Sequence, residues 1–141
     1  MDQNVERQVW ERVLGQTQPP RGDLRALELQ ALEAAAVYRK LSGMFTGRSR
    51  ETLRQLYDTQ AEAAACLKGI GRLSGGGWKP ARVSAPEEPA EKALEKRYHC
   101  ACRAITEYTA RTVDGEFGAV FQHLADLGRT ECVLLAGLLG R

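Results

Sequence analysis

The sequence predicts an all-α fold, in which four long helices form a bundle and a short helix precedes them. Apolar residues recur with the 3.6-residue period of an amphipathic helix over most of the chain. Glycine and proline interrupt this period repeatedly, and no stretch alternates apolar and polar residues as a strand would. The chain has 141 residues, of which 43% are hydrophobic and 27% charged, and this is the size and composition of one globular domain.

A short helix is expected at the N-terminus, over 2–14, with Trp10 on its apolar stripe. Glycine and proline in the segment 15–20 end it. The long helices are expected at 23–44, 49–73, 90–113 and 116–139. We therefore divide the chain into an N-terminal helix at 1–15 and a bundle at 22–141.

The connections between the long helices differ in length. The first and the last are short, and Asp114-Gly115 makes the tight turn of the last one. The middle connection, 74–89, contains consecutive glycines and several prolines, so it cannot be helical through its middle. Two helical hairpins joined by a long crossover are therefore predicted. Trp78 in this crossover either packs against the bundle or docks a partner.

Helical projection gives each long helix an inward stripe, and the stripes of the two hairpins correspond. Tyr38 and Tyr108 lie near the ends of equivalent helices. The spacing of Gln60, Ala63 and Leu67 on the second helix of one hairpin is repeated on the other hairpin. The repeating residues are Gly128, Glu131 and Leu135. The two hairpins are thus interpreted as diverged copies of each other.

Several stretches resemble the ferritin-like family, especially small rubrerythrin-related proteins. They include Leu67-Lys68-Gly69-Ile70, Leu94-Glu95-Lys96-Arg97-Tyr98 and Asp114-Gly115-Glu116-Phe117. The resemblance implies a four-helix bundle in which each hairpin supplies a Glu two turns before a Tyr, and then a Glu-x-x-His pair. It further implies that these side chains bind two iron ions.

Carried over position by position, the ligand set is almost empty. The positions before the tyrosines hold Ala31 and Ala101, and the Glu-x-x-His positions hold Gln60, Ala63, Gly128 and Glu131. Only Glu131 is a carboxylate, whereas a di-iron centre needs several carboxylates and usually imidazoles. His99 and His123 fall on outward faces and cannot substitute. The resemblance therefore implies a degenerate member that lacks the metal site.

A buried polar cluster is predicted at the emptied site, around Glu131 and Gln60. A carboxylate on an apolar stripe needs a partner, and the amide of Gln60 or the hydroxyl of Tyr38 or Tyr108 could donate to it. The cluster is either structural only or a site for a ligand or a single ion. Glu28 lies near the inner stripe, either partly exposed at its edge or in a polar core contact.

Charge and cysteine content exclude several classes of function. A net charge of +2, spread along the chain, gives no reason to expect a nucleic-acid or membrane partner. No apolar run approaches the length of a membrane span, and the polar N-terminus is not a secretory signal, so a cytoplasmic location is expected. The four cysteines lack Cys-x-x-Cys spacing and are interpreted as reduced thiols, with a metal or redox role as the alternative.

The favoured function is a non-catalytic structural or protein-interaction role without a cofactor. The alternatives are an iron-handling protein or di-iron oxidoreductase with atypical ligands, and a small-molecule binder in the bundle core. A homodimer or another homo-oligomer is expected, because the N-terminal helix carries Trp10 and the second helix carries further apolar residues outside its inner stripe, namely Leu29, Leu32, Ala36 and Val37. In the competing interpretation, the N-terminal helix covers this surface.

Overall fold

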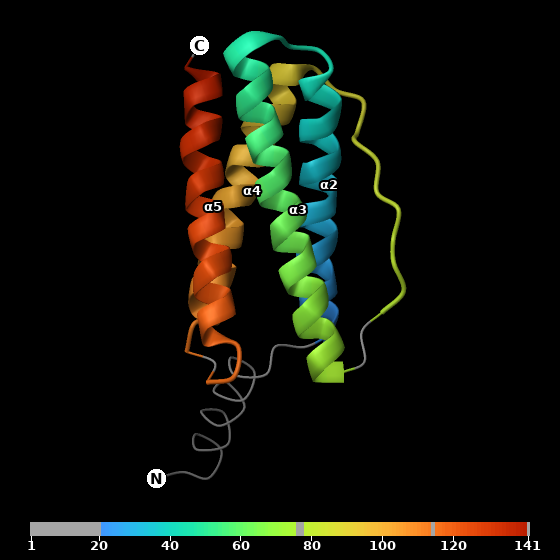
Figure 1. Ribbon diagram of the computed structural model, residues 1–141, viewed down its shortest axis with the longest axis vertical. Helices are drawn as coiled ribbons and strands as arrows, with labels where there is room; N and C mark the ends of the chain where they lie inside the picture. The colour runs from blue at the N-terminus through green and yellow to red at the C-terminus, as the bar shows by residue number, and fades with distance from the viewer. Residues whose placement is uncertain (1–20, 76–77, 114, 141) are drawn as a thin grey trace, which may run out of the picture.

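The part of the chain that the computed structural model describes, residues 21–75, 78–113 and 115–140, consists of helices and the loops that join them. The helices in these ranges are α2 (Arg21–Ser42), α3 (Gly47–Gly75), α4 (Ala90–Ala110) and α5 (Gly118–Leu139), and they lie side by side in Figure 1. The all-α prediction is therefore confirmed. The helix expected at 2–14 lies outside the described residues.

The helices pair as two hairpins. The closest packing is between α2 and α3 and between α4 and α5, while α3 also packs on α5 and α2 more loosely on α4. Consequently α2 and α5 are diagonal neighbours across the bundle. The crossover leaves the end of α3, passes along the outside of α2 and enters α4 at the opposite end (Figure 1). The predicted order of two hairpins and a long crossover matches this path.

The helix boundaries differ from the expected ones by a few residues. The second helix ends at Ser42 and not at 44, and the last begins at Gly118 and not at 116. A Cβ on Gly118 would come within 2.6 Å of the carbonyl oxygen of Thr112, so the turn between α4 and α5 packs against this glycine. The third helix is longer than expected at both ends, and its first residue, Gly47, has a φ of 63° that favours glycine.

The fourth helix ends at Ala110, three residues before the expected boundary. The backbone N–H of Arg111 donates to the carbonyl of Tyr108, and that of Thr112 donates to Thr109. These three-residue hydrogen bonds tighten the last turn and end the α-helical pattern. Propensity alone did not mark this end, because 111–113 contains no glycine or proline.

The core consists of two apolar clusters stacked along the bundle. The cluster at one end includes Leu27, Leu67, Tyr108, Phe121 and Leu124. The cluster at the other end includes Val37, Tyr38, Leu53, Leu56, Leu94 and Leu135. On α3, α4 and α5 the residues between the two clusters include Gln60, Arg97 and Glu131, which are all buried. We call these three residues, together with Tyr38 from α2, the central polar layer.

The predicted inward stripes are largely confirmed. The residues that helical projection places on the inward stripe of α2 are all buried, namely Leu24, Leu27, Ala31, Ala34, Ala35 and Tyr38. Several stripe residues on the other helices, such as Ile105 and Val120, are only half-buried. None of the helices in the described ranges combines the length and the apolar character that a membrane span requires.

Candidate functional site

The candidate site is the central polar layer, to which each of the four helices contributes one side chain. Tyr38 is fully buried, and Gln60, Arg97 and Glu131 are 7%, 6% and 3% exposed. Burial of one neutral amide, one cation and one carboxylate in the middle of an apolar core is costly unless these groups interact with one another. Their arrangement therefore decides what the centre of the bundle can do.

The carboxylate of Glu131 is held by a donor from the opposite side of the bundle. The hydroxyl of Tyr38 donates to Oε2 of Glu131 over 2.5 Å. Burial raises the pKa of Glu131, and the hydrogen bond from Tyr38 and the positive charge of Arg97 offset this only in part. Burial also raises the pKa of Tyr38 well above its ordinary value, and the nearby charge of Glu131 adds to this. The phenol therefore stays protonated and keeps its role as a donor.

Arg97 is the partner that the sequence did not indicate. Its guanidinium interacts with both Tyr38 and Glu131, so a cation, a phenol and a carboxylate form one group. Helical projection places Arg97 on the same face of α4 as Ala101 and Tyr108. A charged residue on an inward stripe was the available signal, although arginine is usually assigned to the surface. Its Nε is buried without a hydrogen-bond partner in the described structure.

Gln60 was one of the candidate donors to Glu131, and it does not supply the hydrogen bond. Its side chain is buried at the predicted level, but no hydrogen bond joins it to Glu131 in the described ranges. Tyr108 was the other candidate donor. It lies close enough for the charge of Glu131 to help burial raise its pKa, yet the hydrogen bond comes from Tyr38. The cluster is thus centred on Glu131 as expected, with a different set of partners.

The positions that the resemblance marks as emptied ligands all lie in the interior. Ala31, Gln60, Ala63, Ala101, Gly128 and Glu131 are buried, as are Tyr38, Tyr108 and Glu28. The side chain of Ile105 on α4 fills the space beside Gly128. A Cβ at Gly128 would come within 2.7 Å of Cγ1 of Ile105, so a glutamate there would have to displace this isoleucine.

A di-iron centre does not fit these residues. The described part of the chain contains no group of three or more His, Cys, Asp or Glu side chains placed to hold a metal ion. The single central carboxylate already accepts the hydroxyl of Tyr38 and faces the cation of Arg97. A guanidinium at this position repels a metal cation and competes for the carboxylate. His99 and His123 are on exposed faces, as predicted.

Glu28 lies in a second polar contact, between α2 and the crossover. It is buried and accepts a hydrogen bond from the indole Nε1 of Trp78. The ring of Trp78 lies over Gly71 of α3, where a Cβ would overlap it. Of the two alternatives for Glu28, the polar core contact is therefore the observed one. Trp78 packs against the bundle, as in the first of the two interpretations of the crossover.

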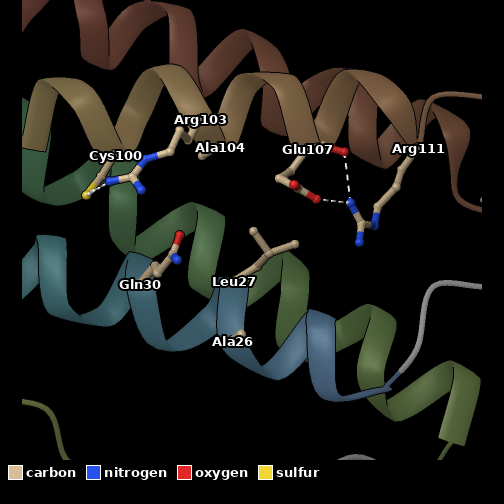
Figure 2. Close-up of a pocket in the computed structure, with 8 residues that line it drawn as sticks. All are labelled: Ala26, Leu27, Gln30, Cys100, Arg103, Ala104, Glu107 and Arg111. Carbon is tan, nitrogen blue, oxygen red and sulfur yellow. Dashed lines mark hydrogen bonds and ion pairs between the residues drawn. The ribbon is translucent and has the colours of Figure 1, made fainter.

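A separate cavity of about 380 Å³ opens between α2 and α4, which are the most loosely packed of the adjacent helices (Figure 2). Its walls are formed by Ala26, Leu27, Gln30, Cys100, Arg103, Ala104, Glu107 and Arg111. Nη1 of Arg111 binds Oε2 of Glu107 over 2.8 Å, and Nη2 of Arg103 lies 3.8 Å from Sγ of Cys100. The cavity is a groove on the side of the bundle, since its lining includes no residue of the central polar layer.

No protein-family model, curated protein or solved structure matches this chain. What the chain does is therefore inferred from its own side chains and from how they pack.

Proposed function

We propose that this chain is a ferritin-like helical bundle that has lost its di-iron site and has a structural or protein-interaction role instead of a catalytic one. The observation that carries the proposal is the position of Arg97 beside Glu131 and Tyr38, where the resemblance would place the metal ligands. A buried cation at this place neutralises the one remaining carboxylate. The centre is thereby stabilised without a metal ion.

The substitutions around the cluster support the same proposal. Carboxylates that remain after a metal is lost repel one another in a medium of low polarity. Alanine, glycine and glutamine at the other ligand positions remove this repulsion. Fully buried side chains such as Leu56, Leu124 and Leu135 occupy the surrounding core. A binder of small molecules in the bundle core is less well supported for this reason.

Metal analysis tests the loss of the di-iron site. The chain is produced in iron-supplemented medium, its iron content is measured, and its thermal unfolding is followed by circular dichroism with and without a chelator. We expect iron well below one ion per chain and an unchanged unfolding temperature. Two ions per chain, lost together with stability on chelation, would instead support the iron-handling alternative.

The surface that we propose for association lies at the end of the bundle where α2 joins α3. Met44 and Phe45 are 63% and 37% exposed there, and Leu139 at the end of α5 is 37% exposed. Beside them is a hollow of about 400 Å³ lined by Phe45, Ala90, Glu91, Leu94, Leu138 and Leu139. Exposed apolar side chains around a hollow are typical of an interface.

The occupant that we propose is a second copy of this chain. Phe45 both protrudes and borders the hollow, so a two-fold axis would place each copy's Phe45 against the hollow of the other. The apolar surface of α2 named in the sequence analysis is less prominent than this end of the bundle. Val37 is only 4% exposed, and Leu32 and Ala36 line a depression whose other wall includes Ala85 of the crossover.

The mass in solution tests this surface. At high micromolar concentration we expect a dimer for the wild type and a shift toward the monomer for Phe45→Ser. The matched control is Val133→Ser, because Val133 is 71% exposed on α5 and is not among the residues that line the hollow. A monomeric wild type, or a dimer lost in Val133→Ser but kept in Phe45→Ser, would contradict the proposed surface.

A further inference from the structure

Two of the four cysteines lie against each other on neighbouring helices. Sγ of Cys102 on α4 is 3.9 Å from Sγ of Cys132 on α5, and the two residues are 30 positions apart in the chain. Cys102 is exposed and Cys132 is half-buried, and both are free thiols. This distance is van der Waals contact between two sulfur atoms, so little movement separates the thiols from a covalent bond of about 2.05 Å.

The approach of the two helices explains why these sulfur atoms meet. Because α4 and α5 are antiparallel, a step of about one turn forward on α4 corresponds to one turn back on α5. Ile105 lies three residues after Cys102, and Gly128 lies four residues before Cys132. The missing side chain at Gly128 allows Ile105 to come close, which brings the two helices together one turn from the cysteine pair.

We propose that Cys102 and Cys132 are a redox pair that forms a reversible disulfide between α4 and α5. The oxidant is a small-molecule disulfide. The exposed thiolate of Cys102 attacks one sulfur of this disulfide, the S–S bond of the oxidant breaks, and its other half leaves as a thiol after taking a proton. Cys132 then loses its proton to solvent and attacks the sulfur of Cys102, and the second half leaves as a thiol. Two protein thiols are thus oxidised by two electrons.

The surroundings assign the order of these steps. Burial raises the pKa of Cys132 to about 12, and its hydrogen bond and charge interaction with Cys102 and the charge of Glu131 add to this effect. Cys132 is therefore a poor first nucleophile at neutral pH. Cys102 is accessible to an external disulfide, and once it is in a mixed disulfide, Cys132 is the thiol next to it.

Cys100 provides a matched control within the same stretch of helix. Residues that are two positions apart in a helix point about 160° away from each other, so Cys100 and Cys102 face different neighbours. Cys100 lines the groove between α2 and α4, where the guanidinium of Arg103 lies 3.8 Å from its sulfur. Only Cys102 of the two contacts α5 through the sulfur of Cys132.

The experiment uses the full chain and oxidised glutathione. After incubation, free thiols are blocked with N-ethylmaleimide and the protein is digested with trypsin without reduction. Trypsin cuts after Arg97, Arg103 and Arg129 and releases peptides 98–103 and 130–141. We expect these two peptides joined by one disulfide within a monomeric chain, reversed by dithiothreitol. We also expect the oxidised form to unfold roughly 10 °C higher than the reduced form.

The variants distinguish a redox pair from accidental oxidation. Cys132→Ser should leave Cys102 trapped as a mixed disulfide with glutathione, and Cys102→Ser should leave Cys132 unmodified. Cys100→Ser should retain the cross-link. A wild-type chain that keeps the mixed disulfide at Cys102, links Cys100 or Cys66 instead, or cross-links two chains would overturn the proposal. Tandem mass spectrometry of the wild-type linked peptides shows whether N-ethylmaleimide is on Cys100 or on Cys102, and this decides the point even if a variant fails to fold.

Discussion

The phenol of Tyr38 and the carboxylate of Glu131 are hydrogen-bonded across the diagonal of the bundle, over 93 positions of sequence. Their helices, α2 and α5, are separated on either side by α3 and α4. The bond therefore passes through the centre of the core and joins one hairpin to the other. This hydrogen bond can therefore form only when both hairpins are correctly assembled.

Removing the donor of this bond should destabilise the protein. In Tyr38→Phe the carboxylate loses a buried hydrogen bond, and we expect a loss of about 1.5–3 kcal/mol in the free energy of unfolding at pH 7. Tyr108→Phe is the control, because Tyr108 is also buried near Glu131 but does not supply the hydrogen bond. Its loss should be smaller, below about 1 kcal/mol. Urea unfolding measures both, and equal losses would contradict this assignment.

The raised pKa of Glu131 predicts a specific dependence of stability on pH. A carboxyl group with a raised pKa binds its proton more tightly in the folded state. Its contribution is fully present below the pKa of the unfolded chain, about 4.3, and is lost as pH rises through the folded value. Glutamine does not ionise, so Glu131→Gln lacks this pH-dependent loss. The free energy of unfolding of the variant should therefore rise relative to that of the wild type between pH 4.5 and 7.5.

At pH 7.5 we expect Glu131→Gln to lie within about 1 kcal/mol of the wild type, since the amide oxygen still accepts from Tyr38 and relief of the cost of burying the ionised carboxylate offsets the lost attraction to Arg97. Glu131→Ala is the contrasting variant, because it leaves a buried hydroxyl without its acceptor and a buried guanidinium without the charge of the carboxylate. It should cost about 3 kcal/mol or more. A loss above about 2 kcal/mol in the glutamine variant would show that the ionised carboxylate is itself required.

Arg97 and Glu131 should be strongly coupled. Arg97→Met leaves a buried carboxylate without its cation, and we expect a loss of about 3–4 kcal/mol at pH 7.5. The loss should be smaller at pH 5, because Glu131 can then take up a proton. Arg97→Met combined with Glu131→Gln should recover most of the stability, and a double-mutant cycle of urea unfolding measures the coupling.

Arg111 supplies the control for this cycle. It is also buried, directly after the end of α4, but its carboxylate partner, Glu107, is half exposed to solvent. We expect Arg111→Met to cost less than Arg97→Met, with no recovery on adding Glu131→Gln. Additive losses for Arg97 and Glu131 would contradict the proposed central group.

The sequence predicted the helices and most of the buried faces, because apolar period and helix breakers are local signals. It also placed Glu131 in a buried polar cluster, since a carboxylate on an apolar stripe needs partners. The burial of Arg97 was not predicted, because a charged residue is normally assigned to the exposed face of a helix. It did not predict how the crossover covers α2, since the contact of Trp78 with Glu28 joins residues 50 positions apart. Only the folded chain brings such groups together.

The contact of Ile105 with Gly128 predicts opposite effects for two glycine substitutions. Gly128→Ala gains up to about 1 kcal/mol in helix propensity but forces Ile105 to move, and we expect a net loss of about 1–2 kcal/mol. Gly69→Ala on α3 meets no atom within 4 Å and should be stabilising by about 0.5–1 kcal/mol. Thermal unfolding compares the two. Stabilisation by both would mean that the helices are not closely packed at Gly128.

The crossover contacts α2 near both of its ends. Nη1 of Arg25 donates a hydrogen bond to the carbonyl of Lys79 over 3.3 Å, and Nζ of Lys40 forms a salt bridge with Glu87 over 3.4 Å. Between these two points Arg82 is exposed. A protease cutting there would leave both hairpins whole, with Tyr38 on one fragment and Arg97 and Glu131 on the other. The core of the bundle would then be an interface between two separate polypeptides. The gene could accordingly be split at this codon, and the two halves would reassemble through the buried hydrogen bond between Tyr38 and Glu131 and the core around it.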